Sequence, residues 1–327
     1  MTTDSKRPRP PLGIRNGLNP TRARVPVEHA SISAFDFVWH LKNTQRRIHP
    51  DDTADALIAA FEAGEVRAGL WPHDTALTPN SRLPAGTDVW FYRMPAEELQ
   101  VPYTCEILHE DDRLLVVNKP PYLATMPRGK HITQTATVQL RRSTGNDELA
   151  PAHRLDRLTS GVLVFTKRRE VRGAYQDLFA KRRAYKTYEA IADFDQDLQP
   201  GIVWRSRMEK TAGEIQGRIV PGEPNAITKL SNLKLVDAHR QRRLSKIFGP
   251  LPPQGIYELK PATGRTHQLR LHMWAAGLPI LGDPAYPYIL PEEEEDFRIP
   301  MCLNASELRF VDPIDGKLRV FSCVPRW

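Results

Sequence analysis

The chain has 327 residues, 40% hydrophobic residues and a formal net charge of +7, with a pI near 9.3. This length is enough for two domains, and the excess of Lys and Arg favours a polyanionic partner such as nucleic acid. The sequence lacks an apolar run of the roughly 18 residues that a membrane span requires, lacks a signal peptide, and has three separated cysteines, so we expect a cytoplasmic protein with reduced thiols and no membrane association.

Residues 1–28 form the first segment. They contain Arg7-Pro8-Arg9-Pro10-Pro11 and scattered basic residues, without periodic apolar positions. Such a composition predicts a disordered basic tail, which either touches RNA phosphates or is an inert extension.

Residues 29–98 are expected to form a small domain. Residues 52–64 read as a capped helix that ends at a glycine, and residues 65–67 and 88–92 alternate as strands. The order of these elements resembles an S4-type RNA-binding module. Residues 49–52 are acidic where such a module has a basic helix, so we interpret the domain as a degenerate S4-like domain.

Residues 99–327 are expected to form the catalytic domain. Helical spacing is confined to residues 170–182, whereas several segments have the pattern of strands. Residues 107–112 are expected to form a strand and then a turn. The other expected strands are 114–118, 162–165, 186–191, 226–235, 256–259 and 268–272. Many strands and few helices predict an α+β fold with a mixed, largely antiparallel central sheet and flanking helices.

One polar segment stands directly before a buried strand. Residues 152–161 read Ala-His-Arg-Leu-Asp-Arg-Leu-Thr-Ser-Gly, and the apolar strand 162–165 follows. Asp156 should therefore lie at the rim of a core, where a carboxylate needs a positive partner. Residues 264–272, read as a polar-decorated strand with two arginines, offer one.

A second polar feature is the basic run Lys181-Arg182-Arg183. It is interleaved with Phe179, Tyr185 and Tyr188, a mixture suited to phosphate contact and base stacking.

Three motifs occur in the order of a known family. They are His153-Arg154-Leu155-Asp156 with Thr159-Ser160-Gly161, then Lys186-Thr187-Tyr188-Glu189-Ala190, and then residues 264–272 followed by Gly282-Asp283-Pro284-Ala285-Tyr286. On these motifs the chain resembles the RluA-like pseudouridine synthases over roughly residues 100–327. Residues 112–120 agree more weakly with the pattern of the same family. The resemblance implies a central sheet with an RNA-binding cleft and the isomerisation of uridine in structured RNA, either rRNA or tRNA.

The resemblance also implies roles for individual residues. Asp156 would be the catalytic carboxylate, acting as nucleophile or proton shuttle, with Arg270 paired to it and Tyr188 against the uracil. Arg154 would enter the space that a flipped uridine leaves. The remaining candidates for substrate binding are His153, Leu269, Arg265, Thr266 and His267.

The reaction exchanges no electrons overall, so we expect no redox cofactor and no metal. His267 and His272, read as residues of one strand, would lie on its opposite faces, which does not suit zinc. The chain departs from the family pattern at residues 125–130 and 303–305, and neither departure touches the named catalytic positions.

We expect a monomer that binds structured RNA. The alternative function is a non-catalytic RNA-binding or ribosome-assembly protein that keeps the fold. A further possibility is a base-modifying enzyme of another chemistry that also flips its target.

Overall fold

The computed structural model describes residues 9–29, 31–211, 213–325 and 327. The chain divides into a front unit, made of residues up to 99 with 127–134 and 141–147, and a larger unit, made of residues 100–126, 135–140 and 148–327. No helix in the described ranges is both long and apolar enough to cross a membrane.

The front unit contains two small sheets and two helices. A four-stranded sheet has the order β1-β6-β3-β4, and β2 pairs with β5. Its elements are β1 (Thr21–Arg24), η2 (Val27–His29), β2 (Ile32–Ser33), α1 (Ala34–Asn43), α2 (Ala54–Glu62), β3 (Arg67–Ala68), β4 (Thr75–Ala76), β5 (Arg82–Leu83) and β6 (Asp88–Phe91).

Strand β1 corrects the expected extent of the disordered tail. It pairs along β6, and Arg22 and Arg24 both form ion pairs with Asp88 of that strand, at 2.6 and 2.9 Å. The alternation of residues 21–24 thus forms an edge strand. Residues 1–8 of the expected tail lie outside the described residues.

The two front helices have ordinary polar caps. The Ser33 side chain accepts a hydrogen bond from the Asp36 N–H at the start of α1, and Thr53 does the same for Ala56 at the start of α2. Gly64, with φ +68°, follows the end of α2. The expected helix at residues 52–64 is present in this form.

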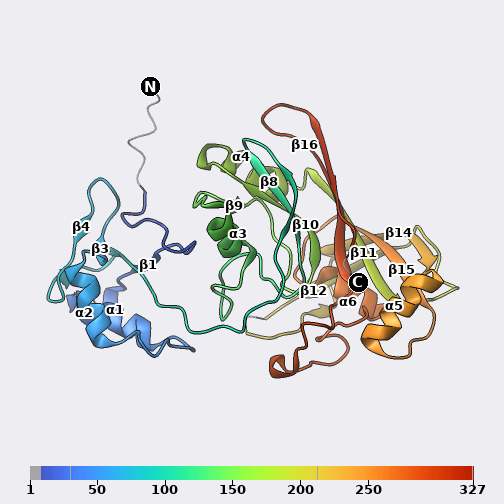
Figure 1. Cartoon of the computed structure of the whole chain (residues 1–327), viewed down its shortest axis with the longest axis horizontal. Helices are drawn as coiled ribbons and strands as arrows, with labels where there is room; N and C mark the ends of the chain where they lie inside the picture. Colours follow the sequence, from blue (N-terminus) through green and yellow to red (C-terminus); the bar gives the residue numbers. More distant parts are fainter. Residues whose placement is uncertain (1–8, 30, 212, 326) are drawn as a thin grey trace. The chain divides into compact units, whose positions relative to one another are not determined.

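The larger unit is built on one sheet. Along residues 100–327 the elements are β7 (Glu106–Glu110), β8 (Leu114–Lys119), α3 (Ala136–Thr144), β9 (Ala150–Pro151), β10 (Ser160–Thr166), α4 (Arg169–Ala180), β11 (Ala184–Asp193), β12 (Val203–Glu209), β13 (Arg218–Val220), β14 (Ala226–Leu235), α5 (Ala238–Phe248), β15 (Gln254–Pro261), α6 (Gln268–Ala275), η3 (Glu292–Glu294), β16 (Leu303–Val311) and β17 (Leu318–Ser322). The strand order is β13-β12-β14-β15-β11-β16-β10-β8-β7, with β17 paired to β16 and β9 to β10 (Figure 1).

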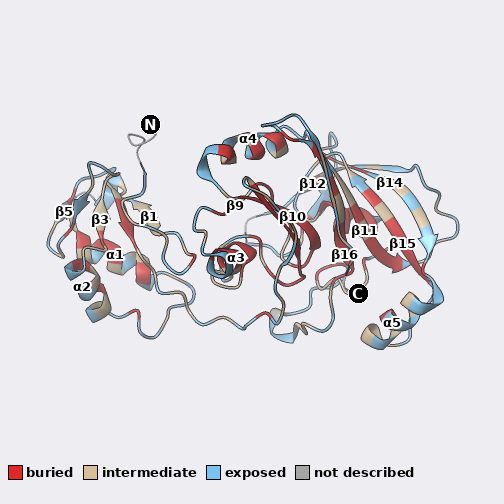
Figure 2. Ribbon diagram, turned by 45° about the horizontal axis from the view of Figure 1, so that its top comes forward, coloured by how far each residue is buried: buried red, intermediate tan, exposed pale blue. Residues whose placement is uncertain are grey.

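The sheet is mixed and largely antiparallel, as the sequence predicts. The pairing of β10 with β16 is parallel, and the other pairings are antiparallel. Strand β10 is buried along its whole length, which explains why its sequence is a continuous apolar run (Figure 2).

Alternation along β10 divides the packing into two layers. Val162 and Val164 pack with α4, whereas Leu163 and Phe165 pack into the largest core cluster on the other face. Tyr188 and Leu269 belong to that largest cluster. We call the face of the sheet that carries this cluster the Tyr188 face.

Candidate active site

The loop of residues 152–159, which we call the motif loop, is tied to the sheet by a glycine. Gly161 has φ +118°, and a Cβ added there would lie 2.4 Å from the carbonyl oxygen of Ala305 on β16. Only glycine allows the two backbones to come so close. The Ser160 hydroxyl donates to the Asn304 side-chain oxygen at 2.9 Å. The Ser-Gly pair of the motif therefore fixes where the motif loop joins the sheet.

A buried threonine holds the residue before Asp156. The Leu155 N–H donates to the Thr125 hydroxyl at 3.1 Å, and the same hydroxyl lies 2.8 Å from the Leu155 carbonyl, to which it donates. The Thr137 hydroxyl donates in turn to the Thr125 carbonyl at 2.7 Å. Both departures from the family pattern contact the motif, Thr125 at Leu155 and Asn304 at Ser160, although not at the candidate catalytic residues.

A buried lysine holds the residue after Asp156. The Lys119 ammonium donates to the carbonyl oxygens of Pro120, Leu123 and Arg157, at 2.8, 2.8 and 3.1 Å. Burial lowers the pKa of Lys119 to about 7, and the negative charge of Asp156 acts in the opposite direction. With Thr125 before it and Lys119 after it, the backbone that carries Asp156 is held on both sides.

The Asp156 carboxylate itself is partly exposed. It makes no hydrogen bond or ion pair with any residue that the structure describes, whereas its charge acts on Lys119, Tyr188, His267 and Arg270. Its oxygens are therefore available to a substrate, in a field to which Lys119 and Arg270 contribute positive charge.

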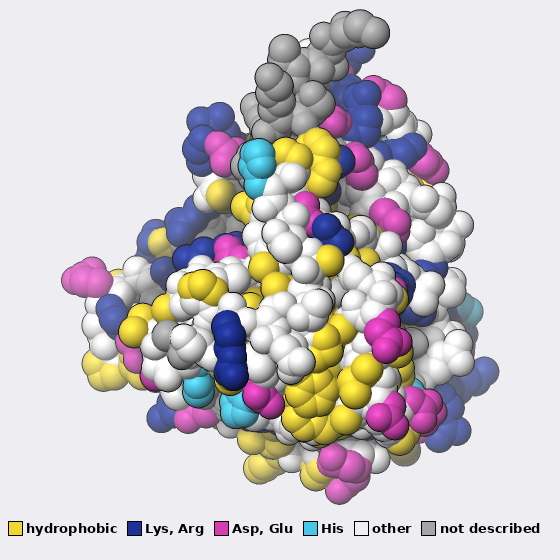
Figure 3. Space-filling view, turned by 90° about the vertical axis from the view of Figure 1, so that its left-hand side faces the viewer, with side chains coloured by type: hydrophobic (Ala, Val, Ile, Leu, Met, Phe, Trp, Pro, Cys, Tyr) yellow, Lys and Arg dark blue, Asp and Glu magenta, His cyan; other side chains and the backbone are white. Residues whose placement is uncertain are grey.

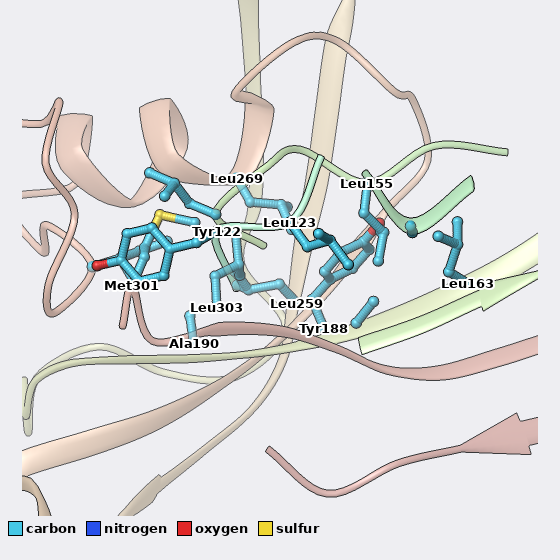
Figure 4. Close-up of a cluster of buried hydrophobic side chains, with 14 of the residues drawn as sticks. Tyr122, Leu123, Leu155, Leu163, Tyr188, Ala190, Leu259, Leu269, Met301 and Leu303 are labelled. Carbon is cyan, nitrogen blue, oxygen red and sulfur yellow. The ribbon is translucent and has the colours of Figure 1, made fainter. Parts of the chain in front are cut away.

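Tyr188 reaches this site because of a β-bulge. The register of β11 against β16 shifts between Thr187 and Glu189. Lys186 therefore pairs with a residue of the α4 layer, whereas Tyr188 packs with the largest core cluster. Figure 4 shows Tyr188 beside Leu155 of the motif loop. Burial, and then the charge of Asp156, raise the pKa of Tyr188 well above its usual range.

Residues 268–275 form helix α6, which corrects the expected strand at 268–272. Six consecutive residues, Gln268–Met273, are buried. A helix buried on all sides shows no amphipathic period, so the alternation Leu-Arg-Leu-His reads falsely as a strand. Gly277, with φ +78°, follows the helix end. The argument that His267 and His272 occupy opposite faces of a strand is also wrong.

Two polar residues of α6 anchor it to the sheet. The Gln268 amide donates to the Thr228 hydroxyl at 2.9 Å, and the His272 ring bridges Ser206 and Thr228, both at 2.9 Å. Burial lowers the pKa of His272 to about 4, so the ring is neutral near pH 7. These motif residues place the helix, and Arg270 with it.

Arg270 forms its ion pair with Asp283 instead of Asp156. The guanidinium is bidentate, with Nε 2.7 Å and Nη2 2.5 Å from the two carboxylate oxygens, and both side chains are buried. Burial lowers the pKa of Arg270, but the hydrogen bonds to Asp283 and the charges of Asp283 and Asp156 together raise it. The expected direct pair is therefore wrong, although Arg270 contributes positive charge to the environment of Asp156.

His267 closes the same side of the site. Its Nδ1 lies 3.0 Å from the Tyr286 hydroxyl, which accepts the Gly217 N–H at 2.7 Å. Burial and the Arg270 charge lower the pKa of His267 to about 4, against the charge of Asp156. The neighbouring Arg265 and Thr266 are exposed, and Arg265 Nε donates to the Asn225 carbonyl at 3.3 Å.

The remaining candidates divide between the two layers. Leu269 lies in the largest core cluster, whereas His153 is buried in the α4 layer, 4.4 Å from Phe179 between ring centroids. His153 Nε2 accepts the Val164 N–H at 3.3 Å, and burial lowers its pKa well below the usual value. A neutral, enclosed ring does not fit the expected substrate contact. Arg154, the next residue, is exposed.

Sequence reasoning missed three residues of the site: Thr125, Lys119 and Asp283. The signals for the last two were present in Asn118-Lys119-Pro120 and Gly282-Asp283-Pro284, which count as matches to the family pattern without a role. Thr125 counts only as part of a departure from the family pattern, because its role depends on a segment 30 residues away.

Comparisons with known proteins agree with this arrangement. A family model described as RNA pseudouridylate synthase matches residues 113–275. The chain is 32% identical over 233 residues to the dual-specificity RNA pseudouridine synthase RluA of Haemophilus influenzae, covering 71% of this chain and 95% of that protein. It is 35% identical over 215 residues to tRNA pseudouridine synthase C of Vibrio vulnificus, covering 64% and 85%.

A solved structure shares the fold. The human RNA pseudouridylate synthase domain containing 1 protein matches with a TM-score of 0.51 and 25% identity, over 70% of this chain and 86% of that one.

Proposed function

The chain belongs to the RNA pseudouridylate synthase family, and we propose that it isomerises specific uridines in rRNA or tRNA to pseudouridine, with Asp156 as the catalytic carboxylate. One observation carries this assignment. The Asp156 carboxylate is partly exposed and has no hydrogen-bond or ion-pair partner in the described parts of the chain, yet its backbone is held on both sides.

The chemistry requires one ionised carboxylate. The C1′–N1 bond of uridine breaks and a C1′–C5 bond forms, while the C5 proton leaves and N1 takes up a proton. Asp156 either attacks the nucleoside covalently or moves the proton. Against the effect of burial, the charge of Asp156 acts to raise the pKa of Lys119 and of Arg270, so both basic groups lie within its electrostatic reach.

Arg270 acts on Asp156 through its charge, without a direct ion pair. Because Asp283 occupies both donor edges of the guanidinium, Asp156 keeps its oxygens for the substrate. The pair also fixes the position of Arg270, which an unpaired side chain would leave to its rotamers.

Access to the target base requires flipping. A stacked uridine must leave the RNA helix, at a cost of a few kcal/mol. The exposed Arg154 is suited to enter the vacated space, since its planar guanidinium can stack on bases. Tyr188 and Leu269 form apolar surface beside the carboxylate.

The finer assignments belong to the same proposal. We take the front unit to be a degenerate S4-like module, a cleft along the sheet to bind the RNA, and the protein to act as a cytoplasmic monomer. On the face that Figure 3 views, basic and acidic side chains are interspersed. Such a surface fits auxiliary RNA contact better than a dominant binding site.

Release of tritium tests the function. Purified protein is incubated with RNA tritiated at uracil C5, and label in water is counted. Wild type releases label, and Asp156→Asn releases none. Asp177→Asn, the same chemical change at an exposed position on α4, serves as the matched control and releases label like wild type.

Two outcomes would contradict the proposal. Equal release by wild type and Asp156→Asn would remove the aspartate from the mechanism. RNA binding by wild type without any release would favour the non-catalytic RNA-binding alternative.

A further inference from the structure

A row of exposed side chains crosses three strands of the larger unit. Tyr185 of β11 pairs with Arg309 of β16, which pairs with Val320 of β17. Tyr185 is 75% exposed, Val320 is 47% exposed and the Arg309 side chain is 51% exposed. Val311 and Leu318, paired in the next row, are also exposed. These side chains form an exposed, largely apolar surface, which we call the hairpin platform; its one guanidinium, that of Arg309, lies 3.6 Å from the half-exposed Glu307 carboxylate, in a pair that solvent weakens.

The hairpin platform lies on the Tyr188 face of the sheet. Arg309 lies between Leu308 and Phe310, beyond the β-bulge of β16, so it faces away from the layer that contains these two residues. Leu308 and Phe310, of the other parity, pack into the α4 layer. Tyr185 lies three positions before Tyr188 on β11, about 10 Å along the strand.

The motif loop approaches the same end of β11. The His153 ring packs on Phe179, and the Lys186 ammonium lies 5.3 Å from the centroid of that ring. The His153 ring and the Lys186 ammonium therefore lie against the same Phe179 ring, and the exposed Arg154 follows His153 in the motif loop. The expected cluster of three aromatic residues beside Lys181–Arg183 is reduced to one exposed ring, because Phe179 and Tyr188 pack inside.

Charge indicates what could cover this surface. Arg182 and Arg183 are exposed at the start of β11 and form no ion pair with any described residue. A second copy of this chain, docked on the same surface by a two-fold axis, would bring Arg309, Arg182 and Arg183 against themselves. An RNA strand instead offers phosphates to the guanidinium groups and a flat base to the ring.

Resting on the proposed function, we infer that the hairpin platform binds one unpaired RNA base next to the target uridine, with Tyr185 as the stacking ring and Arg309 at the backbone phosphate. The target uridine then lies in a single-stranded segment whose neighbour is already splayed from the stack. In this arrangement Arg154 enters the space that the flipped uridine leaves, and Tyr185 stacks on the neighbouring base.

The test measures stacking separately from catalysis. The probe is an oligouridine that carries a single 2-aminopurine, whose fluorescence falls on stacking, and binding is followed with full-length protein. Tyr185→Ala should weaken binding by about 5- to 150-fold and remove the quenching. The matched control Tyr185→Phe should stay within about twofold of wild type, because it keeps the aromatic face. Thermal unfolding should not change, since the ring is exposed.

The outcomes separate this inference from the proposed function. Unchanged binding and quenching in Tyr185→Ala, with tritium release that still depends on Asp156, overturns the platform alone. Quenching lost in Tyr185→Ala but equal in wild type and Asp156→Asn supports the platform whether or not release occurs. A wild-type dimer in sedimentation that Tyr185→Ala dissociates, with RNA affinity unchanged, assigns the surface to a second copy and overturns the inference.

Discussion

The ion pair between Arg270 and Asp283 allows a quantitative prediction. The Arg270 side chain is 4% exposed and that of Asp283 is 0% exposed, and two hydrogen bonds join them. Asp283 Oδ1 also accepts the Ala285 and Tyr286 N–H groups, at 2.8 and 3.2 Å. Asp283→Asn keeps one oxygen for these backbone groups but removes the negative charge. Arg270 is then buried without a compensating charge.

Breaking a buried pair on one side costs about 3–5 kcal/mol, because the remaining charge has lost both water and partner. This corresponds to about a 150- to 5,000-fold drop in the local folding equilibrium. The chain has two compact units, so a single unfolding midpoint is a poor measure. Amide hydrogen exchange at α6 reports the larger unit by itself, and its protection should fall by that factor.

A double variant provides the control. Arg270→Met with Asp283→Asn removes the charge along with its partner, and should recover most of the lost protection, with a coupling energy of about 2–3 kcal/mol. If Asp283→Asn costs less than about 1 kcal/mol, the pair does not hold α6 in the way described. The argument that Asp283 leaves Asp156 free would then fail with it.

Three further predictions concern the surroundings of the site. Gly161→Ala should destabilise the larger unit by about 2–6 kcal/mol, from backbone strain and the clash with β16. Gly173→Ala, in open space on α4, should stabilise it by about 0.5–1 kcal/mol. Amide hydrogen exchange in β10 that ranks the two variants alike would refute the packing argument. Thr125→Val should lower kcat by about 10- to 100-fold with KM within about twofold, since Leu155 loses its hydrogen bonds to the hydroxyl. Thr125→Ser keeps the hydroxyl and should restore kcat. A rise in KM alone would count against a positioning role. Burial lowers the pKa of His272 to about 4, below the unfolded value, so the stability that its neutral form contributes is lost as pH falls from about 6.5 towards 4. In acid titrations, His272→Gln should therefore flatten the decline of stability over that range. An unchanged slope would contradict the assignment.

Local patterns in the sequence were sufficient for much of the fold. The continuous apolar run of β10 predicts a buried strand, and the spacing of residues 170–182 predicts α4. The polar residue and the glycine that flank α2 mark its ends. Each of these features depends on contacts that repeat within a few residues, so a short window of sequence contains the information.

Other features were misread because their cause is not local. Helix α6 is buried on all sides, so its residue types do not reveal a period. His153 was grouped with Asp156 by its place in the motif, yet the turn sends it to the opposite layer of the sheet. Tyr188 faces the site because β16 has one extra residue at the β-bulge, where residues 305 and 306 lie opposite Tyr188 alone.

The sequence by itself determined the inventory of the site: a carboxylate, an arginine and a tyrosine in motifs of fixed spacing. Only the tertiary structure decided which groups are paired. Arg270 binds Asp283, 13 residues away, and Leu155 binds Thr125, 30 residues away. Partners of this kind depend on how the strands and loops are folded together. The same carboxylates and guanidinium groups could be matched in several ways, and close packing selects one of them.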